Sequence, residues 1–205
     1  HPVLGCNLAV TGNVPQGAGL SSSAALEVAV AAALVVVGGG TITNVKTSRF
    51  DLNRLEIARI GQDAENNFVG CACGIMDQLV SASGVDGHAV LIDCLDNKLT
   101  PVALPSALSI VIVNSNVKRG LVDSEYNQRR AQCEAVAAHF GVPSLRHLDE
   151  TKLDAGQQGL NATSVNRARH VISENQRVLD TVAALEDCKL DKLGRLMAES
   201  HESMR

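Results

Sequence analysis

The sequence "VPQGAGLSSSAALEVAV", from Val14 to Val30, places small residues, three serines and an apolar segment in that order. Gly17 and Gly19 allow a backbone with positive φ that can come close to a ligand. The helix predicted to begin near Ser22 offers unpaired N–H groups and the positive end of its dipole to an anion. The serine hydroxyls can cap this helix or hold a magnesium ion that bridges phosphates. We interpret the stretch as a phosphate-binding loop that leads into a buried helix.

Two common nucleotide-binding signatures are absent from this loop. No lysine follows Gly19, as G-x-x-x-x-G-K-[ST] would require, and the glycines do not fit G-x-G-x-x-G. A glycine turn with a serine N-cap would also explain the two glycines. Three consecutive serines at the start of an apolar helix favour the phosphate-binding interpretation.

The composition is that of an ordinary globular protein. Of the 205 residues, 45% are hydrophobic and 20% charged, and the aromatic content of 2% predicts a core of Val, Leu, Ile and Ala. The net charge of −4, without blocks of like charge, argues against nucleic-acid and membrane-surface partners. The longest apolar run, residues 28–37, is much shorter than the roughly 20 residues of a membrane helix. The six cysteines lie mostly in apolar segments, which predicts reduced, buried thiols and a cytoplasmic location.

Hydrophobic periodicity and turn residues predict mixed helices and strands. The expected strands cover residues 2–11, 88–94 and 107–116. The expected helices cover residues 22–37, 51–68 (or from 48), 76–83, 163–186 and 189–203, with a further helix that runs from a Ser124 cap to Phe140. A domain boundary is expected near residue 105, which would divide the chain into domains 1–105 and 106–205.

Four segments resemble a known family of small-molecule kinases, those named for galactose, homoserine, mevalonate and phosphomevalonate. The segments are "PQGAGLSSSAA" (15–25), "GQDAENNFVGCACGIMDQLVS" (61–81), "VIVNSNVKRGLVDSEYNQRRAQCE" (111–134) and "LMAESHESMR" (196–205). The run of serines is the form found in the galactokinase branch, to which the chain is most similar. The resemblance implies an α+β fold with a ribosomal-S5-domain-2-like N-terminal domain and a ferredoxin-like C-terminal domain, both incomplete here.

The same resemblance implies a sugar kinase that transfers the γ-phosphate of ATP to the anomeric hydroxyl of galactose, giving galactose 1-phosphate and ADP. Asp77 matches the catalytic base, although by position alone it could merely cap the following helix. Ser23 and Glu65 match the ligands of Mg²⁺, while Gly74 and Tyr126 join Asp77 on the sugar side. The loop around the ATP phosphates comprises Gly17, Ala18, Gly19, Leu20, Ser21, Ser22 and Ser23.

The chain departs from the family pattern at both ends. The family's arginine-containing first motif and its glycine-rich last motif are absent, so we expect an internal part of a longer protein. Residues 1–205 alone are expected to be inactive and prone to aggregate, whereas the full-length protein is expected to be a monomer that binds small molecules. Two alternatives remain open: a regulatory sensor that binds galactose and ATP, and a related kinase such as one for N-acetylgalactosamine.

Overall fold

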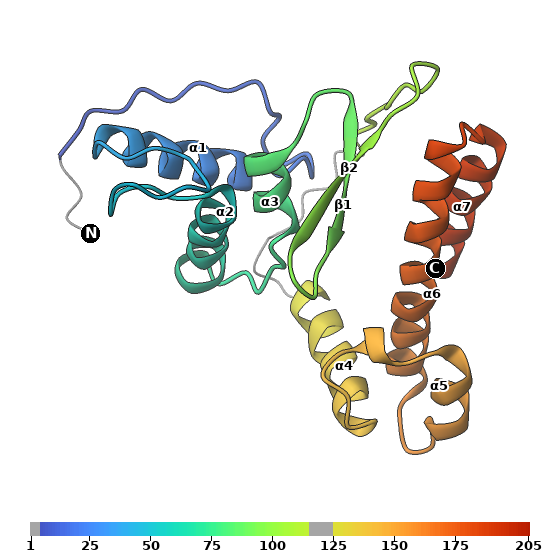
Figure 1. Ribbon diagram of the computed structural model, residues 1–205. Coiled ribbons are helices and arrows are strands. Elements are labelled where there is room, and N and C mark those ends of the chain that lie inside the picture. The colour runs from blue at the N-terminus through green and yellow to red at the C-terminus, as the bar shows by residue number, and fades with distance from the viewer. Residues whose placement is uncertain (1–4, 115–124) are drawn as a thin grey trace. The chain divides into compact units, whose positions relative to one another are not determined.

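The computed structural model describes the backbone of residues 5–114 and 125–205, and side chains in the second range from residue 127 onward. Helices and one two-stranded sheet make up the described chain, which confirms the predicted α+β class (Figure 1). Within these residues the chain forms two compact units. The first contains residues up to Pro101 and those from Ile110 to 114, and the second contains Val102–Ser109 and the residues from 125 onward.

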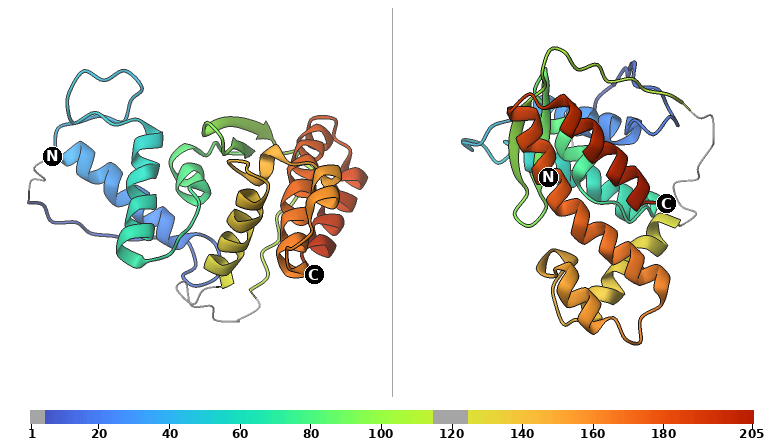
Figure 2. Two further views of the ribbon diagram at one scale, coloured as in Figure 1. Left: turned by 90° about the horizontal axis from the view of Figure 1, so that it is seen from below. Right: turned by 90° about the vertical axis from the view of Figure 1, so that its right-hand side faces the viewer.

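Three α-helices form the body of the first unit: α1 (Ser22–Val37), α2 (Arg54–Asp63) and α3 (Met76–Ser83). Each of them packs against the other two (Figures 1 and 2). A π-helix, η1 (Ala64–Val69), continues directly from α2. The bounds of α1 and α3 agree with the sequence prediction, and Gly38 ends α1 by donating its N–H to the carbonyl of Leu34 at 3.0 Å.

The prediction that α1 is buried on every side was wrong. Only three of its residues are buried, namely Ala24, Val28 and Ala31, and they face the other helices of the unit. Leu26 is 48% exposed and Val36 is 62% exposed. The apolar composition predicted burial all round, but α2 and α3 cover only part of the helix surface among the described residues.

The second helix starts later than either predicted position, at Arg54, because Asn53 caps it. The Asn53 side chain accepts a hydrogen bond from the Glu56 amide at 2.9 Å, and the Glu56 carboxylate accepts one from the Asn53 amide at 2.8 Å. This reciprocal pair is a capping box. The predicted end near Phe68 falls inside the π-helix, so the segment is helical to Val69 with a change of hydrogen-bond pattern.

Asp51 organises the loop that joins α1 to α2. Its side chain is 3% exposed and accepts hydrogen bonds from both the amide and the hydroxyl of Thr41, at 2.7 and 2.9 Å. Thr47 donates in the same two ways, at 2.8 and 3.1 Å, and the Ser48 amide donates at 2.7 Å. These bonds, with the Thr47 amide as the largest cause, hold the pKa of Asp51 well below its usual range.

The sheet is a hairpin of β1 (His88–Asp93) and β2 (Lys98–Ala103). The first strand was predicted and the second was not, because Lys98 and Pro101 interrupt its apolar pattern. The turn between the strands places Asn97 at φ 58°, a left-handed conformation that asparagine adopts more readily than most residues.

Two predicted strands are not formed in the described residues. Residues 5–11, from the segment expected at 2–11, and residues 107–114, from that expected at 107–116, contain no strand. The side chains of Ile110, Val111, Ile112 and Val113 are 60–84% exposed. A strand needs a neighbouring strand for its backbone hydrogen bonds, and the described residues supply none to either segment.

The second unit is helical. It contains α4 (Glu125–His139), the 3₁₀-helix η2 (Leu145–His147), α5 (Glu150–Gly156), α6 (Ala162–Glu186) and α7 (Leu190–Ser203). The long helix α6 packs against α4, α5 and α7 (Figure 2). The predicted ranges of α4, α6 and α7 agree with the structure to within a residue, while η2 and α5 were not predicted. The proposed Ser124 cap lies outside the described residues.

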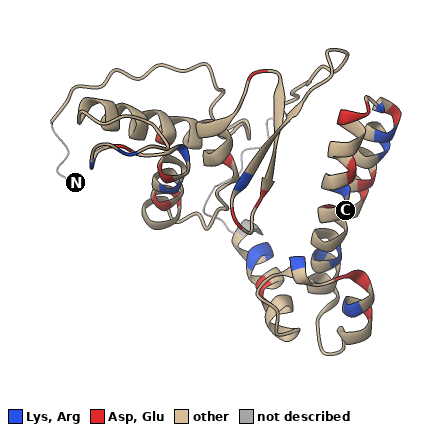
Figure 3. Cartoon of the chain, viewed as in Figure 1, with Lys and Arg blue, Asp and Glu red and all other residues tan. Residues whose placement is uncertain are grey.

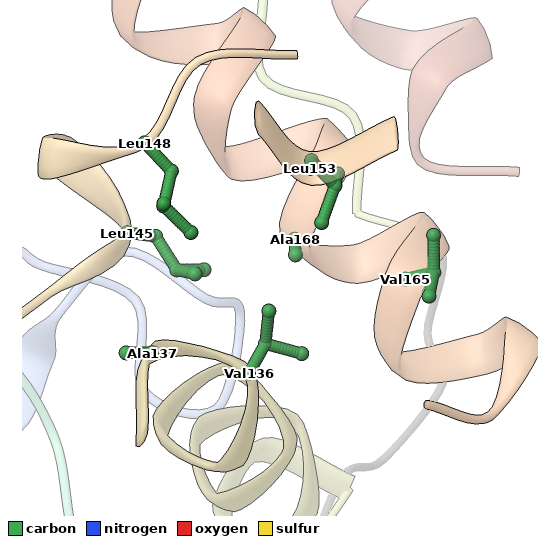
Figure 4. Close-up of a cluster of buried hydrophobic side chains, with 7 residues drawn as sticks. All are labelled: Val136, Ala137, Leu145, Leu148, Leu153, Val165 and Ala168. Atoms are coloured by element: carbon green, nitrogen blue, oxygen red, sulfur yellow. The ribbon is translucent and has the colours of Figure 1, made fainter. Parts of the chain in front are cut away.

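Aliphatic side chains from α4, η2, α5 and α6 form the core of this unit (Figure 4). Its buried members are Val136, Ala137, Leu145, Leu148, Leu153, Val165 and Ala168. Phe140 packs against this cluster from its edge and is partly buried. The prediction of an aliphatic core is therefore confirmed for this unit.

Charge and sulfur are distributed unevenly over the described residues. Figure 3 shows both signs of charge along α6 and α7, whereas α1 carries Glu27 as its single charged residue.

The prediction of buried cysteines was largely wrong, because Cys6, Cys94 and Cys188 are exposed and only Cys71 is buried. In the described parts of the chain, no helix has both the length and the apolar character needed to cross a bilayer.

We predict that Leu153→Ala lowers the free energy of unfolding by about 2–5 kcal/mol, because it leaves a cavity in the core of the second unit. Leu153 is 0% exposed. The matched control is Leu179→Ala on α6, where the side chain is 54% exposed and the expected change is within about 0.5 kcal/mol. Urea unfolding of both variants tests this, and equal losses would contradict the assignment of the core.

We also predict that Asp51→Asn destabilises the protein at neutral pH and that this difference disappears in acid. Because folding lowers the pKa of Asp51, its contribution is fully present above the unfolded-state pKa of about 3.9. The contribution is lost as the pH falls through the lower folded-state pKa. Urea midpoints of the wild type and the variant should therefore differ at about pH 7 and draw together only as the pH falls below about 3.9 toward the folded-state pKa. A difference that is independent of pH would contradict the role of the ionised carboxylate.

Candidate functional site

The loop before α1 has a backbone that only a few residue types adopt readily. Gly17 and Gly19 lie at φ 70° and 72°, and Ser21 at φ 56°. A left-handed conformation at a residue other than glycine is uncommon and often marks a functional position. No atom lies within 4 Å of the position that a Cβ would occupy on Gly17 or Gly19. A ligand can therefore approach the backbone closely at both glycines.

The start of α1 differs from that of a helix with an ordinary serine cap. Ser21 occupies the N-cap position, but its side chain forms no capping hydrogen bond, and no acidic residue lies in the first turn. The first N–H groups of the helix thus have neither a serine oxygen from the cap nor a neighbouring carboxylate. Such an end is suited to a bound anion. This geometry favours the phosphate-binding interpretation of the loop over the simple glycine turn.

Asp77 and Gly74 lie at the beginning of α3. The N-cap of α3 is Ile75, so Asp77 is the second helical residue and not the cap that the alternative interpretation required. Its side chain is half-buried, while Gly74 is exposed and has no atom within 4 Å of its Cβ position. The helix dipole favours a negative charge at this end of α3.

Glu65 is the second residue of the π-helix and is only 4% exposed. π-Helical turns are rare and frequent at functional sites. The carboxylate of Glu65 lies close enough to that of Glu27, which belongs to α1, to raise the pKa of Glu27.

Glu27 is the residue of this site that the sequence interpretation missed. It accepts a hydrogen bond from Nε2 of Gln78 at 3.1 Å. Burial raises the pKa of Glu27, the bond from Gln78 opposes this shift, and the nearby carboxylates of Glu65 and Asp77 raise the pKa further. Glu27 therefore adjoins both acidic residues assigned from the sequence. The signal was available, because Glu27 is the single charged residue in the apolar helix of residues 22–37.

Ser23 lies four residues before Glu27 on α1, so the two side chains share one face of the helix. This face turns toward α2 and α3, because Glu27 contacts Gln78 of α3 and the Cβ of Glu27 lies 3.2 Å from the Cβ position of Gly61 in α2. Ser23, Glu65 and Asp77 therefore all belong to the first unit, and both carboxylates are near enough to Glu27 to raise its pKa.

The two thiols beside Glu65 are poorly suited to thiolate chemistry. Burial raises the pKa of Cys71, and burial together with the charge of Glu65 raises the pKa of Cys73 to about 11. Among the residues that the structure describes, no group of three or more His, Cys, Asp or Glu side chains could hold a metal ion.

Tyr126 belongs to α4 in the second unit, and its side chain lies outside the described residues. Its assignment to the sugar side of the site therefore stays a prediction from the sequence. The same holds for the individual contacts of Ala18, Leu20 and Ser22 with phosphate, although all three lie in the loop or at the start of α1.

Comparison with known protein families indicates the class of protein. Residues 2–85, which contain the phosphate loop, Glu65 and Asp77, match the family described as "GHMP kinases N terminal domain". This match and the structural likeness reported next support a galactokinase-like member of the GHMP kinases.

One relative is a solved structure of galactokinase from Lactococcus lactis in complex with galactose. It is 30% identical in sequence and superposes with a TM-score of 0.79. The match covers 94% of this chain and 49% of the Lactococcus protein, so the chain spans about half the length of that galactokinase.

Proposed function

We propose that the protein is a sugar kinase that transfers the γ-phosphate of ATP to the anomeric hydroxyl of galactose, with galactose 1-phosphate and ADP as products. The observation that carries this proposal is the left-handed glycine loop at the uncapped start of α1, the helix whose Glu27 is hydrogen-bonded to Gln78, the neighbour of Asp77. The likeness to a galactokinase that was crystallised with galactose supports the choice of substrate. The finer domain assignment, with S5-like and ferredoxin-like parts that meet near residue 105, forms part of this proposal.

In this proposal the backbone from Gly17 to Ser23 holds the phosphates of ATP. The positive φ of both glycines and the open space beside them suit close contact between amides and phosphate oxygens. The uncapped start of α1 adds the positive end of a helix dipole. Phosphoryl transfer depends mainly on such positioning and on stabilisation of charge.

Ser23 and Glu65 would hold Mg²⁺ together with the phosphates. The donor set fits this ion, because Mg²⁺ prefers oxygen ligands and usually binds one or two protein groups in addition to substrate phosphates. Glu65 supplies a buried carboxylate, and Ser23 supplies a hydroxyl at the end of α1 that faces the phosphate loop. When bound, the ion neutralises charge that develops on the transferred phosphoryl group.

Asp77 would accept the proton of the anomeric hydroxyl as the oxygen–phosphorus bond forms and ADP leaves. Its half-buried position at the exposed start of α3 leaves the carboxylate accessible to a sugar. Gly74, which lacks a side chain three residues earlier, leaves space for the ring. Tyr126 is proposed as a further sugar contact, on the basis of its motif alone.

We predict that Asp77→Asn in the full-length protein lowers the rate of galactose phosphorylation by about 10²–10⁴-fold, because an amide cannot accept the proton. The affinity for ATP should be largely retained. Release of ADP that depends on galactose, measured beside nucleotide binding, checks both statements. A parallel assay with N-acetylgalactosamine separates the two sugar substrates. Near-normal turnover in the variant would rule out this base, whereas the absence of galactose-dependent ADP release in the wild type would favour a sensor.

We predict that Ser23→Ala raises the concentrations of Mg²⁺ and ATP needed for half-maximal rate, while the KM for galactose changes little. The physical reason is the loss of one oxygen ligand on the phosphate side of the site. Separate titrations of MgATP and galactose test this. Leu26→Ala, on the exposed face of α1, is a control with no expected effect on either titration. A defect confined to galactose would mean that the loop has been misassigned.

A further inference from the structure

A buried polar contact lies beneath the proposed site and has no part in the chemistry described above. Gln78 is 1% exposed and is the immediate neighbour of Asp77 on α3. Its Nε2 donates to Oε2 of Glu27 at 3.1 Å, and its Oε1 is buried without a hydrogen-bond partner. The Glu27 carboxylate is therefore the hydrogen-bond partner that the structure gives to this buried amide.

The contact depends on a close approach of three helices. At Gly61 of α2, an added Cβ would lie 3.0 Å from Cγ of Gln78 and 3.1 Å from Oε2 of Glu27. Gly61 is itself buried. Any larger residue would press on both partners, so α2 closes over the bond between α1 and α3.

Glu27 also connects the other parts of the site. It lies close enough to Glu65 of the π-helix for that carboxylate to affect its pKa, and it follows Ser23 by one turn of α1. A shift of Glu27 would therefore change the spacing between the phosphate loop, Glu65 and Asp77 at once. Rates of phosphoryl transfer are sensitive to such spacing, because misplacement of about 1 Å can cost about 10²-fold.

We propose that Glu27 is a positioning residue of the kinase, whose hydrogen bond to Gln78 fixes the helix of Asp77 against the helix of the phosphate loop. This inference rests on the proposed function. Glu27 does not contact substrate in this assignment. It acts through Gln78 and Glu65, and an outer partner of this kind typically affects activity by about 10–100-fold.

The test uses the full-length protein and compares Glu27→Leu with Glu27→Gln. Leucine has a similar volume but cannot accept the bond from Gln78, so kcat for galactose phosphorylation should fall by about 10–100-fold with little change in the KM for galactose. Glutamine can accept the same bond through its carbonyl oxygen and can donate to Glu65 through its amide. Glu27→Gln should therefore retain most of the wild-type kcat.

A double-mutant cycle separates positioning from general stability. If Glu27 acts through Gln78, the double variant Glu27→Leu/Gln78→Met should lose no more activity than the worse single variant. Val28→Ala is the matched control, because it removes buried volume at the adjacent position of α1. It should lower the unfolding midpoint but leave kcat unchanged at a temperature where all variants are folded.

Three results would overturn the inference: wild-type kcat in Glu27→Leu, equal damage from Glu27→Gln, or losses that multiply in the double variant. Failure of the proposed function gives a different result, because the wild type itself would then release no ADP in response to galactose. A large effect of Asp77→Asn with none from Glu27→Leu would overturn the positioning role alone.

Discussion

The packing of α1 against α2 and α3 is the constraint on which the candidate site depends. It encloses the bond between Glu27 and Gln78, and it requires glycine at position 61 because the helices approach so closely there. Close-packed interiors transmit small displacements, so the ends of the three helices cannot move independently. The phosphate loop precedes α1, and Asp77 begins α3. The same packing therefore sets the distance between the two proposed halves of the chemistry.

The partly buried carboxylate of Glu27 makes the interface between these helices energetically costlier than apolar packing would be. Burial of Glu27 raises its pKa, and the nearby carboxylates of Glu65 and Asp77 add to the shift. Apolar packing of similar shape would avoid this cost, as it does elsewhere along α1 at Val28 and Ala31. A hydrogen-bonded carboxylate has a directional preference that an aliphatic side chain lacks. A single charged residue in the otherwise apolar helix α1 can therefore define the geometry that phosphoryl transfer requires.

The second unit has a different physical basis. Its aliphatic core draws residues from α4, η2, α5 and α6 (Figure 4). Leu153 and Val136 are completely buried although the chain contains few aromatic residues. This unit also contains polar contacts. Burial raises the pKa of Glu174, but hydrogen bonds from Ser200 and Arg177 outweigh it and lower the pKa. The bond from Ser200 joins α6 to α7, while Arg177 and Glu174 both belong to α6, and neither contact has a role in the proposed chemistry.

The sequence by itself determined the features that depend on local interactions. The ends of α1 and α3 and the left-handed glycines of the loop follow from residues close to one another in the chain. The roles of Asp77 and Glu65 are proposed from the resemblance of their motifs to a kinase family. Only the tertiary structure decided which faces are buried, where Glu27 lies, and that residues 5–11 and 107–114 form no strand. Each of these depends on a partner far away in sequence: Glu27 and Gln78 are 51 residues apart. Helix periodicity and turn chemistry act over a few residues, whereas burial and strand pairing require a specific neighbour that no local pattern identifies.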